Sequence, residues 1–249
     1  METLIPQAKW DQSYDGGTFH YDESRVVFSD LLLKYVPPAA QCLEVGCFPG
    51  NFLLFMGLQR GCTISGIDAT KHLPEMVRRF REYPVQTGSF INQPFEQVPA
   101  NAAFDCVSSF GFIEHFPDFA TVIRHHIDFL KPGGTLIIGL PHFRRLQYVA
   151  RRLLDPKTLE GHYLPSMDFD AISDVIRGEQ LEIVARHFWG TCAYWFDGRP
   201  YGTSRRVLNR AASVVLNAID RRVHLPNRWS SPFMLVVARK PDASLSQEK

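Results

Sequence analysis

The sequence lacks several features that would assign it to other classes of protein. Its 249 residues contain five cysteines, which is an odd number, and no C-x-x-C pair, so disulfide frameworks and zinc sites are disfavoured. No run approaches the roughly 18 apolar residues of a transmembrane helix, and the amino terminus lacks the basic and then apolar order of a signal peptide. We therefore expect a soluble cytoplasmic protein with reduced thiols.

An excess of charge of one sign is also missing. Lys plus Arg number 27 and Asp plus Glu 26, with no long run of like charge. Such a chain offers no broad cationic surface to the phosphates of DNA or RNA. We expect a small-molecule partner and no nucleic acid.

The length supports one α/β core with an attached lid better than two independent domains. We expect a single domain over 1–249, with a core at 38–141, an insertion or lid at about 142–167, and closing strands and helices at 168–240. A monomer and a homodimer both remain open.

Apolar runs of strand length alternate along the chain with amphipathic runs of helix length. The expected strands are 42–47, 63–68, 84–90, 104–110, 135–141, 181–187 and 232–240, and the expected helices are 51–60, 73–83, 119–130, 168–177 and 204–222. This order predicts an α/β fold with a doubly wound, mostly parallel sheet. Its ligand crevice should lie at the carboxyl ends of the strands, just after Val45, Ile67, Gly88, Ser108 and Gly139.

The turn after the first strand, LEVGCFPGNF, indicates the kind of cofactor. The dinucleotide fingerprint requires glycine at positions that are here Gly46, Phe48 and Asn51, so a pyrophosphate would meet a phenylalanine. A ligand with a ribose but no diphosphate fits better. Gly46 permits close backbone approach, and Asp68 ends the second strand where a carboxylate can accept both ribose hydroxyls. Glu44 comes too early to reach a ribose and would bind backbone amides or a cationic ligand group.

Four ordered motifs, LEVGCFPGNF, GID, FDCVSSFGFIEHF and LKPGGTLIIGLP, resemble those of class I S-adenosylmethionine-dependent methyltransferases. The resemblance covers roughly residues 43–141. It implies a Rossmann-like sheet with an antiparallel last strand, methyltransferase activity, and S-adenosyl-L-methionine as cofactor. The implied cofactor-binding residues are Glu44, Gly46, Cys47, Phe48, Gly50, Asp68, Ala69, Ser89, Phe90, Ser109 and Phe110. Phe48 replaces the usual glycine, and Ser89 replaces the usual acidic residue.

Methyl transfer from a sulfonium requires mainly positioning, and a base only when the acceptor is a hydroxyl or a protonated amine. His115, past the fourth strand, is the best-placed base, and His142, directly after the fifth, is the second candidate catalytic residue. The structural alternatives are that His115 shapes a helix start and that His142 is merely solvated. His162 in the insertion would lie over the acceptor. Glu114 could cap a helix or bind an acceptor cation, and the cap is the expected role. We predict no metal site, because no set of carboxylates converges.

Two further segments carry distinctive patterns. Trp10, Tyr14, Phe19 and Tyr21 resemble the leading segment that folds over the cofactor in small-molecule methyltransferases, although simple packing on the sheet would also explain them. In the helix expected at 204–222, apolar residues form one stripe flanked by arginines. We expect this helix to pack on the sheet and do not expect membrane contact, although a basic amphipathic helix can bind an anionic membrane.

The acceptor is inferred from resemblance alone. The loop variant CFPG is similar to that of bacterial methyltransferases of glycan or natural-product assembly, which favours a hydroxyl of a sugar or another small intermediate. Three alternatives stay open: N-methylation of a small amine, a nicotinamide-dependent reductase, and a non-catalytic module that keeps the fold.

Overall fold

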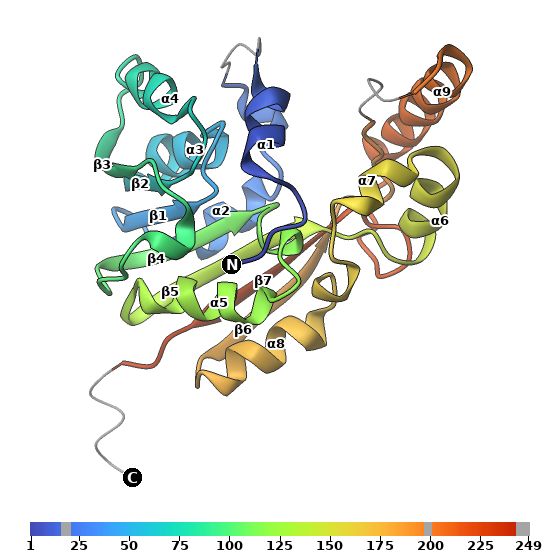
Figure 1. Ribbon diagram of the computed structural model, residues 1–249. Coiled ribbons are helices and arrows are strands. Elements are labelled where there is room, and N and C mark those ends of the chain that lie inside the picture. Colours follow the sequence, from blue (N-terminus) through green and yellow to red (C-terminus); the bar gives the residue numbers. More distant parts are fainter. Residues whose placement is uncertain (16–20, 197–200, 243–249) are drawn as a thin grey trace.

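A seven-stranded sheet forms the centre of the computed structural model, which describes residues 1–15, 21–196 and 201–242 (Figure 1). The strands are β1 Gln41–Val45, β2 Thr63–Ile67, β3 Gln86–Ile91, β4 Phe104–Phe110, β5 Leu130–Pro141, β6 Glu182–Trp189 and β7 Phe233–Arg239. Their spatial order is β3-β2-β1-β4-β5-β7-β6. The first five pair in parallel, and β7 lies antiparallel between β5 and β6. The predicted fold class is confirmed.

Helices cover both faces of the sheet, as Figure 1 shows. The α-helices are α1 Gln7–Tyr14, α2 Ser29–Tyr35, α3 Asn51–Arg60, α4 Leu73–Phe80, α5 Phe119–Asp128, α6 Arg145–Leu154, α7 Pro156–Glu160, α8 Phe169–Gly178 and α9 Thr203–Asp220. The apolar residues of α2, α3 and α4 form one core cluster with the sheet, and those of α5 and α8 form the other. Both broad faces of the sheet are therefore occupied.

Local sequence explains the helix ends. Gly50 begins α3 with φ of 88°, and Gly61 ends it with φ of 66°, so α3 has the predicted bounds. Asp118 caps α5 by accepting from the Thr121 N–H, and Asp168 caps α8 by accepting from the N–H groups of residues 170 and 171.

Six of the seven strands differ from their expected bounds, β4 being the exception, and the differences at β3 and β5 follow from their pairing. β3 ends at Ile91, beyond the predicted end, because its pairing with β2 continues to the end of that strand. β5 begins at Leu130, ahead of the predicted turn at 131–134. The pairing of β4 with β5 is irregular there, and Gly133 has φ of 76°, so the turn residues form an irregularity at the start of the strand.

The expectation that the last long helix packs on the sheet is wrong. Only Asn209 of α9 is buried. α9 contacts α6 and the segment after β6, where the Asp220 carboxylate accepts from the N–H groups of residues 191–193. Figure 1 shows α6, α7 and α9 grouped at one end of the sheet. Within the described residues, no helix combines the length and apolarity needed to cross a membrane.

Candidate active site

A cavity of about 270 Å³ lies at the carboxyl ends of β1, β2 and β4. The loops after these strands supply one wall, the segment after β3 a second, and the amino-terminal residues a third. This is the edge at which a doubly wound sheet binds its ligands. The chain order of the motifs therefore led to the correct edge.

The turn after β1 lets a ligand in the cavity come close to the backbone. Gly46 has φ of 68°, and its N–H donates to the Ile67 carbonyl at 2.8 Å. A Cβ at this position would lie 2.5 Å from the Phe112 ring. The ring of Phe48 packs against the rings of Tyr14 and His72, with distances of 4.5 Å and 5.9 Å between ring centroids. Phe48 is part of the cavity wall and leaves the backbone of Gly46 exposed to the cavity.

Asp68 joins the two strand ends. Its carboxylate accepts from the Phe48 N–H at 3.0 Å and from the Thr70 N–H at 2.9 Å. Burial raises the pKa of this carboxyl group, and the two backbone donors partly oppose that rise. Each carboxylate oxygen keeps a further lone pair for a ligand hydroxyl.

Glu44 lies behind this wall and is 2 % exposed. Burial raises its pKa, the nearby Asp68 carboxylate adds to the rise, and the Leu53 backbone N–H partly opposes it. Its Oε2 has no hydrogen-bond partner among the described residues. One carboxylate oxygen thus has a backbone N–H nearby, and the other has no partner in the described part of the chain, so both expected roles of Glu44, binding backbone amides and binding a cationic ligand group, stay open.

The amino-terminal segment covers the cavity. The Leu4 N–H donates to the His115 carbonyl at 2.8 Å, and the Trp10 ring lies edge-on to the His115 ring at 4.9 Å. The Thr70 hydroxyl donates to Asp11 at 2.8 Å. Trp10 and Tyr14 line the cavity, as a covering segment would, whereas Tyr21 packs against Tyr83 at 5.9 Å; Phe19 lies outside the described residues.

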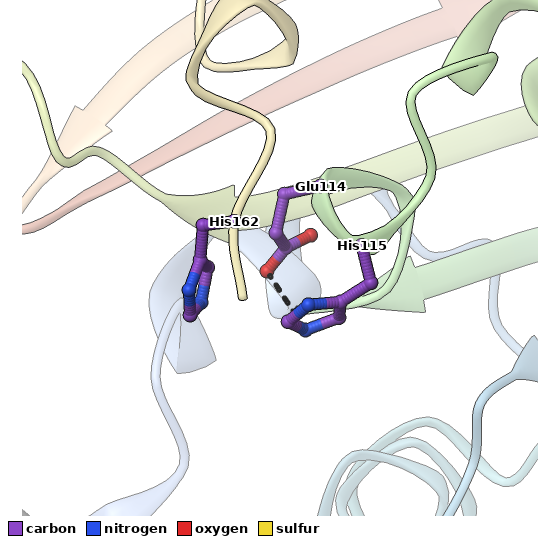
Figure 2. A group of neighbouring side chains, drawn as sticks. All are labelled: Glu114, His115 and His162. Carbon is purple, nitrogen blue, oxygen red and sulfur yellow. Dashed lines mark ion pairs between the residues drawn. The ribbon is translucent and has the colours of Figure 1, made fainter. Parts of the chain in front are cut away.

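His115 connects the cavity wall to a buried polar cluster with Glu114 and His162 (Figure 2). His115, on a short 3-10 helix at Ile113–His115, lines the cavity, and its Nδ1 lies 2.7 Å from the Gly161 carbonyl. Glu114 Oε1 lies 3.9 Å from His115 Nε2, and the rings of His115 and His162 are 4.8 Å apart. Glu114 caps no helix; the prediction that it would is wrong.

Burial dominates the electrostatics of this cluster. It lowers the pKa of His115 to about 4 and that of His162 to about 3, because an imidazolium loses its hydration there. It raises the pKa of Glu114 to about 8. Both rings are therefore neutral near pH 7.

Comparison with known proteins places this geometry in a family. A family profile described as a methyltransferase domain matches residues 21–186, about two thirds of the chain. The chain belongs to the methyltransferase-domain family. Its strand order and its motif series are those of the class I, S-adenosyl-L-methionine-dependent methyltransferases.

Among relatives, the chain is similar to the ubiquinone biosynthesis O-methyltransferase of Xanthomonas axonopodis pv. citri (strain 306), with 34% identity over 118 residues, 43% of this chain and 47% of that protein. The Pseudomonas fluorescens (strain Pf0-1) protein of the same name is 35% identical over 39% of this chain and 42% of its own length. The match thus spans less than half of these relatives.

Solved structures share the fold at low identity. The [4+2]-cyclase SpnF superposes with a TM-score of 0.63 at 16% identity, covering 98% of this chain and 99% of that one. Geranyl diphosphate C-methyltransferase from Streptomyces coelicolor A3(2) superposes with a TM-score of 0.56 at 15% identity. The superposition covers 85% of this chain and 74% of that one.

The residues of this methyltransferase fit the cofactor. Asp68 has spare acceptor capacity, Gly46 leaves room that a Cβ would fill, and Ala69 and Phe110 line the same wall. Of the other residues inferred from the motifs, Cys47, Gly50 and Ser109 are buried behind the wall and shape it. Gly50 is confined because a Cβ there would lie 2.5 Å from Phe80.

The assignment of Ser89 and Phe90 to the cavity wall is wrong. Ser89 is exposed, and its N–H donates to the Ser65 hydroxyl, while Phe90 packs against Phe80 at 5.6 Å. Because β3 runs to Ile91, residues 93–96 reach the cavity instead. The missed signal was Pro94, which marks the turn after a longer strand.

His142 also lies away from the cavity. It is 5 % exposed, its Nδ1 lies 3.1 Å from the Ser231 carbonyl, and its ring packs against Phe188 at 4.9 Å. The antiparallel β7 flanks the end of β5 and draws His142 toward its own side. The prediction that His142 faces the crevice considered only the parallel strand that precedes it. We assign His142 no catalytic role.

Proposed function

We propose that this methyltransferase transfers a methyl group to a hydroxyl oxygen of a small acceptor. One observation carries the proposal. A single cavity has the loop of Gly46 and Asp68 on one wall and the histidine of the fourth motif, His115, on another. Donor and acceptor bound in it would meet within one water-poor space, which is the main requirement of an in-line displacement.

The cofactor side consists of main-chain groups and one carboxylate. S-Adenosylmethionine supplies a methyl group already activated on a sulfonium. Asp68 accepts hydrogen bonds from the ribose hydroxyls, and the positive φ of Gly46 lets the backbone approach the ligand. The side chains of Trp10 and Tyr14 close the cavity against water.

The acceptor side favours oxygen over nitrogen. A methyltransferase for a cationic amine needs free carboxylates near its acceptor. Of the two carboxylates on the cavity wall, Asp68 accepts from two backbone N–H groups, and Glu96 pairs with the Met1 amino group at 3.3 Å. Glu114 is buried next to His115 and does not line the cavity. The names of the O-methyltransferase relatives support the same choice. Aromatic walls at Phe112 and Phe116 suit a ring that carries the hydroxyl.

The test combines binding and turnover. Calorimetric titration with S-adenosylhomocysteine is expected to give micromolar binding in the parent and at least a roughly 100-fold weaker affinity in Asp68→Ala, because hydrogen bonds to a charged group are lost. Asp105→Ala is the matched control, since Asp105 begins β4 at the opposite edge and pairs with Lys131. Its affinity should equal that of the parent.

Turnover is measured as methyl transfer from labelled S-adenosylmethionine to phenols, sugar alcohols and amines. The proposal expects product with a hydroxyl acceptor and none with the amines. Methylation of amines alone would overturn the choice of oxygen, and unchanged cofactor affinity in Asp68→Ala would overturn the assignment of the cofactor side.

A further inference from the structure

The buried cluster at the acceptor end offers three metal-ligating side chains. One ligand atom from each of Glu114, His115 and His162 lies within 4.8 Å of the others. Glu114 and His115 come from the 3-10 helix after β4, and His162 follows α7, so the fold brings together segments far apart in sequence (Figure 2). Two imidazoles and one carboxylate form a donor set for divalent transition metals.

Both histidines are oriented by a backbone carbonyl at Nδ1. His115 Nδ1 lies 2.7 Å from the Gly161 carbonyl, and His162 Nδ1 lies 2.5 Å from the Thr158 carbonyl. A carbonyl accepts, so each Nδ1 donates its proton there; the Gly111 carbonyl also interacts with the His115 ring, and a metal ion at this ring would replace that contact. Metal-ligating histidines are oriented in this way, through a hydrogen bond from the other ring nitrogen to a carbonyl.

Glu114 gives the second, independent observation. The residue is 1 % exposed, and its Oε2 has no hydrogen-bond partner in the described part of the chain. A buried carboxyl oxygen without a partner is costly in either protonation state, whereas a bound cation would satisfy it.

We infer that Glu114, His115 and His162 bind one divalent transition-metal ion, such as Zn²⁺, beside the acceptor. This deepens the proposed function and rests on it for the role of the ion. His115 lines the cavity, so an open position on the ion would face the acceptor hydroxyl and lower its pKa. The O–H bond breaks and its proton leaves to solvent, the new O–C bond forms, and the S–C bond of the donor breaks.

This inference departs from the sequence-based prediction of no metal. No spacing in the sequence relates His162 to the Glu-His pair, because α5, β5, α6 and α7 intervene.

The test is metal binding by the whole protein after treatment with a chelator. Titration with Co²⁺, followed by its visible absorption, and calorimetry with Zn²⁺ should both give one equivalent in the parent. His162→Ala and Glu114→Gln should each weaken binding by at least about 100-fold while S-adenosylhomocysteine affinity stays at the parent value. His224→Ala, which alters an exposed histidine after α9, is the matched control and should bind metal as the parent does.

The outcomes separate this inference from the proposed function. A parent that binds no ion, or a His162→Ala variant that binds as tightly as the parent, overturns the metal site. Full-rate methylation of a hydroxyl acceptor by metal-free protein also overturns it and leaves O-methylation standing. Metal bound at these residues, with turnover of amines only, would leave the site standing and remove the proposed function.

A second inference comes from the surface of α6 and α9. Apolar side chains are exposed on both helices and on the segment after α9, and we call them the α6–α9 face: Leu146, Val149, Leu153, Val207, Leu208, Val214, Val215, Ile219, Leu225 and Trp229. The segments that carry them are joined, since the Leu146 N–H donates to the Trp229 carbonyl and Arg205 donates to the Leu153 carbonyl. A patch of this kind marks an interaction site.

The charge around the α6–α9 face identifies its partner. Arginines surround it at 145, 152, 205, 206, 210, 221, 222 and 228, and none forms an ion pair within the described ranges 1–15, 21–196 and 201–242. Arg145 and Arg228 each lie 5.1 Å from the Trp229 ring. A second copy of the chain would bring arginines against arginines, whereas anionic lipid complements them.

We propose that the α6–α9 face binds the surface of an anionic membrane, with its apolar side chains among the acyl chains and its arginines at the headgroups. The test is co-flotation with vesicles of phosphatidylcholine containing about 30 % phosphatidylglycerol, against pure phosphatidylcholine. The parent should bind the anionic vesicles, more weakly at high salt. A Leu208→Glu, Val215→Glu double variant should bind at least about 10-fold less, with unchanged S-adenosylhomocysteine affinity.

Leu33→Glu is the matched control, since Leu33 is an exposed leucine on α2. It should bind vesicles as the parent does. No binding of the parent at roughly 1 mM lipid would overturn the proposal. Vesicle binding by the double variant that equals that of the parent would also overturn it. So would a parent that is a dimer in solution and a double variant that is a monomer, because the face would then join two copies of the chain.

Discussion

α8 and α9 are amphipathic helices of the carboxyl-terminal half, and their apolar residues lie in opposite surroundings. Ile172 and Ile176 of α8 are fully buried with α5 and the sheet. On α9, Val207 is 64 % and Val215 is 58 % exposed. Helices α2 to α5 and α8 already occupy both broad faces of the sheet, so no apolar surface there remains for α9. An apolar stripe therefore defines a helix face, and the space left by the other elements decides what that face contacts.

The strongest test of this contrast is Ile176→Ala on α8. Removing a fully buried side chain deletes its transfer free energy and leaves a cavity, so the free energy of unfolding should fall by about 2–5 kcal/mol. Urea denaturation would measure it. A loss below about 1 kcal/mol would show that α8 is as loosely packed as α9.

A second test concerns His126 on α5, which shares its core with α8. Burial lowers the pKa of this histidine to about 4, against about 6.5 for an unfolded chain. Below pH 6.5 the unfolded state binds a proton that the folded state does not, so stability is lost as pH falls from about 6.5 to 4. His126→Leu removes this contribution.

The variant should therefore lose less stability than the parent between pH 7 and 5, by about 2 kcal/mol. Urea denaturation at both pH values measures the difference, and the other buried histidines cancel because both proteins contain them. Equal losses in the two proteins would mean that His126 is accessible to water.

Asn209→Ala tests how α9 is attached. The Asn209 Oδ1 accepts from the Tyr194 hydroxyl at 2.6 Å, and its Nδ2 donates to the Leu154 carbonyl at 2.9 Å. Loss of both should cost about 1–2 kcal/mol and speed amide exchange in α9 more than in α8. Asn101→Ala, at an exposed loop position, should change neither. Uniform acceleration of exchange in both helices would contradict the separate attachment of α9.

The smallest effect is expected for Val215→Ala on α9. An exposed side chain loses little burial, so the free energy of unfolding should stay within about 0.5 kcal/mol of the parent. The same urea titration measures it. A loss above about 2 kcal/mol would mean that the α6–α9 face is covered in solution and would also count against membrane binding.

The residues of the proposed cofactor side could be predicted because each directly follows a strand that the sequence pattern identifies. Gly46, Phe48 and Asp68 follow two neighbouring parallel strands, and such strands end at one edge of the sheet. Residues were placed wrongly where the end of a strand lay beyond its predicted position, or where a strand later in the chain packs beside an earlier one. Ser89 and Phe90 were misplaced by the length of β3, and His142 by the antiparallel β7.

The sequence by itself determined the alternation of strands and helices, the methyltransferase motifs and the edge of the sheet at which the cavity lies, because these depend on residues close together in the chain. Only the tertiary structure decided that His162 joins Glu114 and His115 and that the apolar stripe of α9 is exposed. Both outcomes depend on how distant segments share a limited space around one sheet, and a local pattern carries no information about that competition.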